Sequence, residues 1–241
     1  MGDTAMPGAA IDIGGLHKVS LVDFPGRVSA VVFLNGCNFR CPYCHNPDLA
    51  KGAAAGAVAA ETLRDYLEAR RGMLDGVVIT GGEPTLQPGL MRFCESIRSM
   101  GYPLKLDTNG SRPEVLRDLI ASRLVDYIAM DIKTDMETYA TMTGHIKIAA
   151  RIRASIDLIM ASGVDYEFRT TCVRPLISPP VMTRIAALIK GARVYAIQKF
   201  YAKETLDPDC GSRRNDHFDD DELLNLKAIA EPMVECCVLR G

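Results

Sequence analysis

Short apolar runs alternate along the chain with segments in which apolar side chains recur every three or four positions. Six apolar runs predict strands, at residues 29–34, 76–79, 103–107, 125–130, 165–171 and 193–199. Five segments between or beside them have the spacing of amphipathic helices, at residues 61–71, 90–100, 113–121, 146–161 and 180–190. This alternation is typical of parallel βαβ units, so the sequence predicts an α/β fold.

The number of predicted βα units indicates whether the sheet closes into a full barrel. A closed barrel of eight βα units typically takes about 250 residues. With 241 residues and six predicted strands, the chain is expected to form a partial, open parallel β/α barrel of about six βα units. A doubly wound sheet is the alternative, because strand order is not visible in a sequence.

Three segments are expected along the chain. Residues 1–14 are small and polar, which is typical of a flexible leader. Residues 15–202 would form the partial-barrel domain. Residues 203–241 would pack on the same domain as a C-terminal segment, with an exposed loop at 203–220 and a short helix at 221–230.

Polar clusters follow the predicted strands one after another. The sequence between Cys37 and Cys44 follows the first strand, and Gly-Gly-Glu-Pro at residues 81–84 follows the second. Asp-Thr-Asn-Gly at 107–110 follows the third and Asp-Ile-Lys at 131–133 the fourth, while Arg169 and Gln198 lie near the ends of the fifth and sixth. The carboxyl ends of parallel strands share one face, where active sites are built.

The segment Cys-Asn-Phe-Arg-Cys-Pro-Tyr-Cys, residues 37–44, is termed the Cys loop. Its thiols belong to Cys37, Cys41 and Cys44, with no fourth cysteine close by in the sequence. Iron-sulfur clusters usually take four thiolates, so three ligands can hold three irons of a cubane and leave the fourth iron open. Zinc is the competing interpretation, but structural zinc sites normally bring two further ligands at recognisable spacing.

Net charge and composition exclude several other classes of protein. A formal net charge of −2 gives no basic surface for nucleic acid, and no apolar run reaches the roughly 18 residues of a membrane span. The first residues lack a secretory signal, so a cytoplasmic protein is expected. Its eight cysteines then predict metal ligation or reduced thiols rather than disulfides. Cys94 is expected in the core, and packing is also expected for Cys236 and Cys237, whereas Cys210 has no predicted role.

The Cys-x-x-x-Cys-x-x-Cys spacing, with Tyr43 before the last cysteine, resembles the signature of radical S-adenosylmethionine (SAM) enzymes. Residues 21–48, which begin Leu-Val-Asp-Phe-Pro-Gly, resemble one branch in particular, the anaerobic ribonucleoside-triphosphate reductase activating proteins. The resemblance covers about residues 15–201. It implies a radical SAM partial barrel that holds a [4Fe-4S] cluster on Cys37, Cys41 and Cys44.

The resemblance also implies a SAM site. Gly81, Gly82 and Glu83 match the segment that holds the methionyl amino group of SAM. Two glycines also let a ligand approach the backbone closely. Tyr43 belongs to the same expected set, as does Gln198, which stands where some relatives of this group carry a histidine.

Charged residues complete the implied site. Lys133 and Arg169 would lie near the SAM carboxylate or a bound partner peptide, where a fixed cation is favourable. Some glycyl-radical activating enzymes surround a monovalent cation with two carboxylates, and Asp107 and Asp131 match those positions. The residues themselves leave two alternatives open: the carboxylates are solvated, or they pair with Lys133.

By resemblance, a one-electron donor such as flavodoxin or ferredoxin reduces the cluster, SAM is cleaved, and the resulting 5'-deoxyadenosyl radical takes hydrogen from a glycine of a partner enzyme. That partner is expected to be anaerobic ribonucleotide reductase. Three alternatives are an activating enzyme of the pyruvate formate-lyase type, a radical SAM enzyme acting on a small molecule such as a deazapurine precursor, and a non-enzymatic metal or electron-transfer module.

Overall fold

The structure is a computed structural model that describes residues 11–54, 56–143, 147–201, 205–210 and 216–241. These residues form two compact units. The first unit comprises Met1–Asn38, Asp48–Asp107 and Glu114–Tyr127, and the second comprises Phe39–Pro47, Thr108–Pro113 and Ile128–Gly241. Most of the predicted leader lies outside the described residues.

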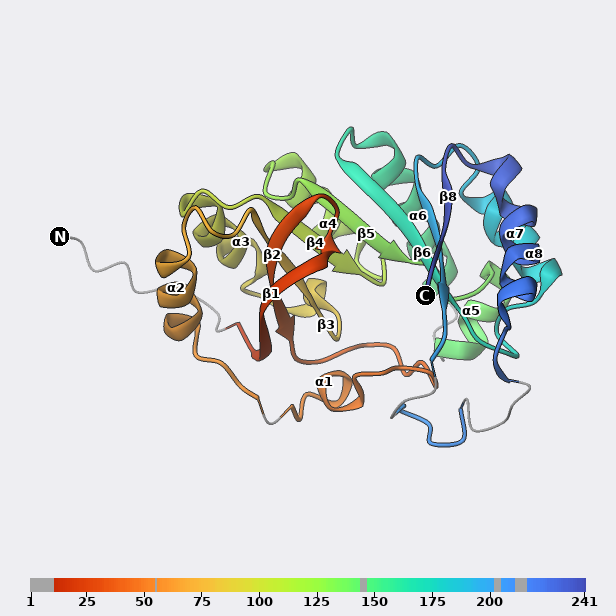
Figure 1. The fold of residues 1–241 in the computed structure, drawn as a ribbon, viewed down its shortest axis with the longest axis horizontal. Coiled ribbons are helices and arrows are strands. Elements are labelled where there is room, and N and C mark those ends of the chain that lie inside the picture. The colour runs from red at the N-terminus through yellow and green to blue at the C-terminus, as the bar shows by residue number, and fades with distance from the viewer. Residues whose placement is uncertain (1–10, 55, 144–146, 202–204, 211–215) are drawn as a thin grey trace. The chain divides into compact units, whose positions relative to one another are not determined.

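The first unit is built on the strands β1 to β4 (Figure 1). β1 (Ile13–Phe24) and β2 (Arg27–Leu34) form an antiparallel hairpin, and β2 then pairs in parallel with β3 (Gly76–Gly81). β4 (Leu104–Thr108) pairs in parallel with β3. The parallel arrangement brings the carboxyl ends of β2, β3 and β4 to the same edge of this unit's sheet.

Helices follow the strands β2, β3 and β4 along the chain. They are α1 (Pro47–Lys51), α2 (Ala60–Ala69), the 3₁₀ helix η1 (Pro84–Leu86), α3 (Leu90–Ser99) and α4 (Pro113–Ala121). α3 buries Phe93, Cys94 and Ile97 on one face, as its apolar spacing predicts. Cys94 is fully buried, and this burial raises the pKa of its thiol to about 12. The expectation that Cys94 packs in the core is therefore confirmed.

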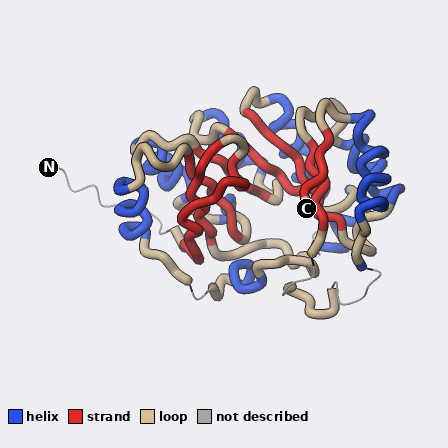
Figure 2. The backbone as a smooth tube through the Cα atoms, in the orientation of Figure 1, coloured by secondary structure: helices blue, strands red, loops and turns tan. Residues whose placement is uncertain are grey.

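The second unit contains β5 (Tyr127–Asp131), β6 (Asp165–Cys172), β7 (Tyr195–Lys199) and β8 (Cys237–Arg240), in that order in the sheet. β6, β7 and β8 are parallel neighbours. The helices of this unit, seen in Figure 2, are α5 (Met136–Thr143), α6 (Ile148–Ala161), α7 (Pro179–Leu188), α8 (Asp220–Ala230) and the 3₁₀ helix η3 (Glu231–Met233).

All six predicted strands are present, as β2 to β7. The five predicted amphipathic helices correspond to α2, α3, α4, α6 and α7, and the short helix predicted at 221–230 corresponds to α8. Two strands were not predicted. β1 carries polar residues without regular alternation and has register shifts against β2, whereas β8 is only four residues long. No helix in the described parts of the chain is long and apolar enough to cross a membrane.

Candidate active site

The first part of the Cys loop is fixed by α1. The backbone N–H of Gly36 donates to the carbonyl of Leu49 at 2.7 Å, and that of Cys37 donates to the carbonyl of Ala50 at 3.2 Å. Gly36 has a φ of 86°, in the left-handed region that favours glycine. The chain direction at the first cysteine is therefore set by a glycine turn and a short helix.

The second part of the Cys loop is held by a segment distant in sequence. The N–H of Leu206 donates to the carbonyl of Cys44, and the N–H of Asp207 to that of Pro42, both at 3.0 Å. Thr205, beside them, is only 8% exposed. The sequence predicted an exposed loop here, and residues 207–209 are exposed as expected, whereas Thr205 is buried. Leu206 and Asp207 supply the hydrogen-bond donors for two backbone carbonyl groups of the Cys loop.

Phe200 packs against the Cys loop from the end of β7. Its ring stacks on His45 at 5.3 Å between centroids and meets the edge of Tyr43 at 6.4 Å. His217 stacks on Phe200 at 5.4 Å. Sequence reasoning missed Phe200, although an aromatic residue directly after a strand end was the available signal. Because Tyr43 and His45 flank Cys44, Phe200 helps to position this ligand candidate.

The donor set fits an iron-sulfur cluster in its chemistry. All eight cysteines are free thiols, and Cys37 and Cys44 are partly exposed whereas Cys41 is buried. Burial raises the pKa of the Cys41 thiol, and the nearby charge of Lys133 offsets part of that rise. Within the described residues no three His, Cys, Asp or Glu side chains are already gathered as a metal site. The ligand set thus remains a prediction from the sequence.

The Gly-Gly-Glu-Pro segment lies against the end of β2. Gly82 N–H donates to the carbonyl of Leu34, and Glu83 N–H to that of Gly36, both at 2.8 Å. A Cβ on Gly82 would lie 2.1 Å from the Gly36 oxygen, and one on Gly81 would lie 2.3 Å from Leu34 backbone atoms. The close approach of two backbones therefore explains both glycines, and a role in binding SAM stays a prediction.

Glu83 is fixed by local hydrogen bonds. Its side chain is 1% exposed and accepts from the backbone N–H and the hydroxyl of Thr85. These bonds cap the first turn of η1, where the orphan N–H groups of a helix need an acceptor. Glu83 therefore has a structural role in this segment, besides the cofactor contact that the resemblance implies.

Asp107 is paired with a buried lysine on its own strand. The ammonium Nζ of Lys105 lies 2.5 Å from Asp107 Oδ1, and the side chains are 2% and 12% exposed. The two residues are two positions apart on β4 and so share a face of the sheet. Lys105 was not among the predicted site residues, because a single lysine in an apolar strand gave no sign of its burial.

Asp131 is paired with two cations. Arg169 Nε donates to Oδ1 at 2.7 Å, and Lys133 Nζ donates to Oδ2 at 2.8 Å. The Lys133 ammonium also lies 6.0 Å from the centre of the Tyr43 ring, within reach of a cation–π contact. The structure thus brings together four of the predicted residues, and it shows the pairing of Asp131 with Lys133 that the sequence left as an alternative.

These pairs shift the ionisation of both partners. Burial opposes charge on Asp131, but the charges and hydrogen bonds of Arg169 and Lys133 outweigh it and hold the pKa of Asp131 well below its usual value. Burial also opposes charge on Lys133, yet the carboxylate of Asp131 raises the pKa of that lysine well above its usual value. The cluster is therefore charged at neutral pH. Its cations would favour an anion such as a carboxylate.

Tyr43 has a buried polar atom without a protein partner. Its side chain is 4% exposed, and its hydroxyl oxygen has no hydrogen-bond partner in the described residues. Such an atom is costly to bury unless a ligand or water satisfies it. Tyr43 therefore remains a candidate for a cofactor contact.

Two further predicted positions differ in their setting. Gln198 is a half-buried residue of β7 in register with Thr171 of β6 and Arg240 of β8. Arg169 lies in the second half of β6, which continues to Cys172, one residue beyond the predicted strand. Its side chain nevertheless reaches Asp131 at the end of β5.

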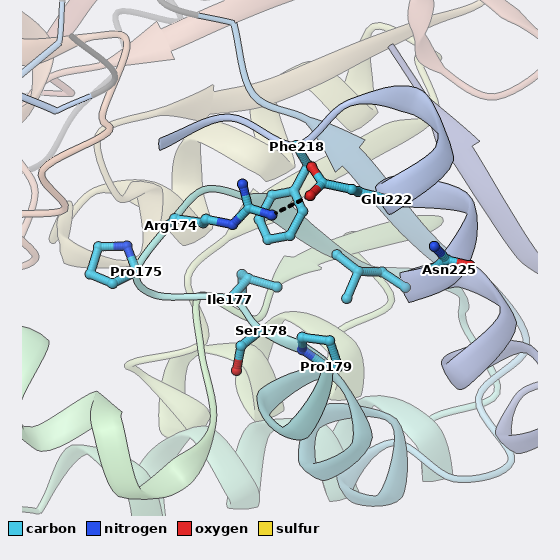
Figure 3. Close-up of a pocket in the computed structure, with 9 residues that line it drawn as sticks. Arg174, Pro175, Ile177, Ser178, Pro179, Phe218, Glu222 and Asn225 are labelled. Carbon is cyan, nitrogen blue, oxygen red and sulfur yellow. Dashed lines mark hydrogen bonds and ion pairs between the residues drawn. The ribbon is translucent and has the colours of Figure 1, made fainter. Parts of the chain in front are cut away.

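The second unit also contains a cavity of about 460 Å³ beside α7 and α8 (Figure 3). Arg174 stacks on the Phe218 ring at 4.1 Å and donates to Glu222 Oε1 at 2.7 Å across this cavity. None of the residues predicted from the sequence is among those that line it. The cavity is thus separate from the cluster around Asp131.

Comparison with known proteins identifies the superfamily to which this chain belongs. The family model of the radical SAM superfamily matches residues 31–179, which include the Cys loop, the Gly-Gly-Glu-Pro segment and the Asp131 cluster. The chain belongs to this superfamily, and membership implies a [4Fe-4S] cluster and SAM as cofactors.

Solved structures support the fold. A radical SAM methyltransferase from Sphaerobacter thermophilus aligns with a TM-score of 0.65 over 90% of this chain and 67% of its own, at 13% identity. The predicted α/β class with a parallel sheet is confirmed, and the likeness is consistent with a partial barrel.

Two relatives define the family more closely. MJ1227 of Methanocaldococcus jannaschii, provisionally named a glycyl-radical enzyme activating enzyme, is 34% identical over 95% of both chains. The pyruvate formate-lyase-activating enzyme of Clostridium pasteurianum is 34% identical over 55% of this chain and 57% of its own. The chain is a member of the glycyl-radical enzyme activating enzymes, a family whose partners are glycyl-radical enzymes.

Proposed function

We propose that this protein generates the glycyl radical of an anaerobic ribonucleoside-triphosphate reductase in the cytoplasm. The observation that carries the proposal is the segment from Leu21 to Asp48, whose sequence resembles the activators of that reductase and contains the whole Cys loop. Similarity to MJ1227 along nearly the full chain supports activation of a glycyl-radical enzyme without specifying which one.

The cysteines and the cationic side chains would bind different groups. Cys37, Cys41 and Cys44 would hold the cluster and leave one iron open for SAM. When bound and reduced by a donor such as flavodoxin or ferredoxin, the cluster supplies the single electron that cleaves SAM. Arg169 and Lys133 are held in place by Asp131. They would orient an anionic group of SAM or of the partner peptide.

The remaining predicted residues would shape the surroundings of SAM. Tyr43 has a buried hydroxyl available to a ligand, and Gln198 offers an amide from β7. Gly81, Gly82 and Glu83 form a segment fixed on the end of β2. Its backbone would face the amino group of SAM.

The test is anaerobic reconstitution with iron and sulfide, followed by electron paramagnetic resonance with SAM and a purified reductase. The expected result is release of 5'-deoxyadenosine and a glycyl radical on the reductase. Cys41→Ser should lose cluster and radical, whereas Cys236→Ser, which alters an exposed thiol, should retain both.

Other outcomes separate the alternatives. A radical on pyruvate formate-lyase but not on the reductase would refute the proposed target while keeping the family chemistry. SAM cleavage that requires a small molecule, without a radical on any glycyl-radical enzyme, would favour the small-molecule alternative. A cluster that does not respond to SAM would overturn the proposal.

A further inference from the structure

Asp107 and Asp131 match the positions at which some related activating enzymes surround a monovalent cation, but their surroundings here do not fit a free metal ion. Asp107 Oδ1 lies 2.5 Å from the ammonium of Lys105. That ammonium is a monovalent cation in its own right, and it is anchored to the protein two residues before the carboxylate it neutralises.

The burial of Lys105 makes this pair difficult to separate. The residue is 1% exposed, and lysine is almost never so deeply buried without a partner. An alkali-metal ion at Asp107 Oδ1 would displace the ammonium and leave it buried without its carboxylate. The cost of such an unpaired buried charge exceeds what a weakly bound monovalent ion gains from one carboxylate.

Asp131 is neutralised in a similar way. Its Oδ1 accepts from Arg169 Nε, and its Oδ2 accepts from Lys133 Nζ. Both oxygens are thus directed at protein cations, and Arg169 and Lys133 are only 14% and 17% exposed. A metal ion there would be placed beside two fixed positive charges, which repel it.

We propose that Lys105 is a built-in substitute for a monovalent cation at Asp107, and that this protein needs no free alkali-metal ion at Asp107 or Asp131. Lys105 lies two residues before the Asp-Thr-Asn-Gly motif. A lysine at this position can therefore be recognised directly in the sequence. The inference concerns charge balance within the fold, and its test does not depend on the proposed reductase.

The test compares thermal unfolding of the reconstituted full chain in sodium, potassium and tetramethylammonium chloride at equal ionic strength. Tetramethylammonium is too large to enter a buried carboxylate site. The wild-type midpoint should agree within about 1 °C in all three salts. Lys105→Met keeps an unbranched side chain that is one atom shorter but removes the charge, and its midpoint should be about 3 °C higher in sodium or potassium than in tetramethylammonium.

Matched variants isolate the buried pair. Lys227→Met removes a lysine that pairs with Glu231 at 2.5 Å on the surface of α8, and it should show no ion-specific shift. The double variant Lys105→Met/Asp107→Asn removes both buried charges and should again be insensitive to the ion. Sodium NMR provides a second measurement, with line broadening expected for Lys105→Met and not for wild type.

Two results would overturn the inference. One is a wild-type protein stabilised by sodium or potassium, or one that broadens the sodium line, with the effect abolished by Asp107→Asn. The other is a folded Lys105→Met variant that remains indifferent to the ion. Should that variant not fold, the wild-type salt comparison and sodium spectrum still decide between a built-in and a free cation.

Discussion

Arg169 donates from Nε to Asp131 Oδ1 at 2.7 Å and joins the interior of β6 to the last residue of β5. Lys133 binds the other oxygen of the same carboxylate. Removing the carboxylate leaves two largely buried cations facing each other, so Asp131 is central to the charge balance of this cluster.

We expect Asp131 to make the stability of the protein depend on pH when no iron-sulfur cluster is bound. Its pKa in the folded state lies below the ordinary 3.8, because Arg169 and Lys133 outweigh the opposing effect of burial. A depressed folded pKa stabilises the fold above the unfolded pKa, and the contribution is lost as pH falls. The free energy of unfolding, measured with urea, should therefore decrease from about pH 5 to about pH 3.

Asp131→Asn tests this dependence. The variant should lose about 2 kcal/mol at neutral pH and show a shallower decrease at acid pH. Asp165→Asn is the control, because Asp165 is 77% exposed and pairs with Arg193 at 3.4 Å on the surface. It should change stability by less than about 0.5 kcal/mol. An unchanged pH profile in Asp131→Asn would contradict the prediction.

Gly82→Ala should displace the backbone at Cys37, the first cysteine of the Cys loop. Its Cβ would lie 2.1 Å from the Gly36 oxygen and 3.1 Å from the Cys37 nitrogen, so the two backbones must move apart. Chemical denaturation should show a loss of about 3 kcal/mol, and the reconstituted iron content should fall.

Gly15→Ala is a matched control for that prediction. A Cβ there would meet only Phe33 side-chain atoms at 3.8 Å, which is ordinary contact. It should fold with normal stability and normal iron content. Equal behaviour of the two alanine variants would show that the approach of Gly82 to Gly36 does not constrain the Cys loop.

Phe200→Leu should weaken retention of the cluster. The change removes the ring that stacks on His45 and meets Tyr43, the two neighbours of Cys44. We expect faster cluster loss to an iron chelator, together with about 1–2 kcal/mol of lost stability.

Phe168→Leu separates that effect from general destabilisation. Phe168 is also fully buried in the second unit, and its ring packs on Tyr166 at 5.3 Å. The control should lose similar stability but release its cluster at the wild-type rate. If both variants release the cluster equally fast, Phe200 has no specific positioning role.

Arg240→Met should destabilise the protein by about 3 kcal/mol in urea unfolding. Arg240 on β8 donates to both carboxylate oxygens of Glu167 on β6, at 2.8 and 2.6 Å, and the Glu167 side chain is 1% exposed. Adding Glu167→Gln should recover part of the loss, because the buried negative charge is then gone. A double variant less stable than Arg240→Met alone would contradict this explanation.

The sequence by itself determined the local structure and the list of candidate ligands. Apolar runs separated by helical spacing are properties of neighbouring residues, and they predicted strands β2 to β7. The positions of Gly82, Asp131 and the Cys loop at or just after the ends of strands followed from the same pattern. So did the resemblance to radical SAM enzymes, since it rests on short contiguous motifs.

Only the tertiary structure decided how these residues are paired. Asp131 and Arg169 are 38 positions apart, and Arg240 is 73 positions from Glu167. No local spacing specifies such contacts, because they arise when separate strands become neighbours in a sheet. Lys105 shows the same limit within one strand. Its burial depends on what covers β4, and this decides whether its charge faces water or neutralises Asp107.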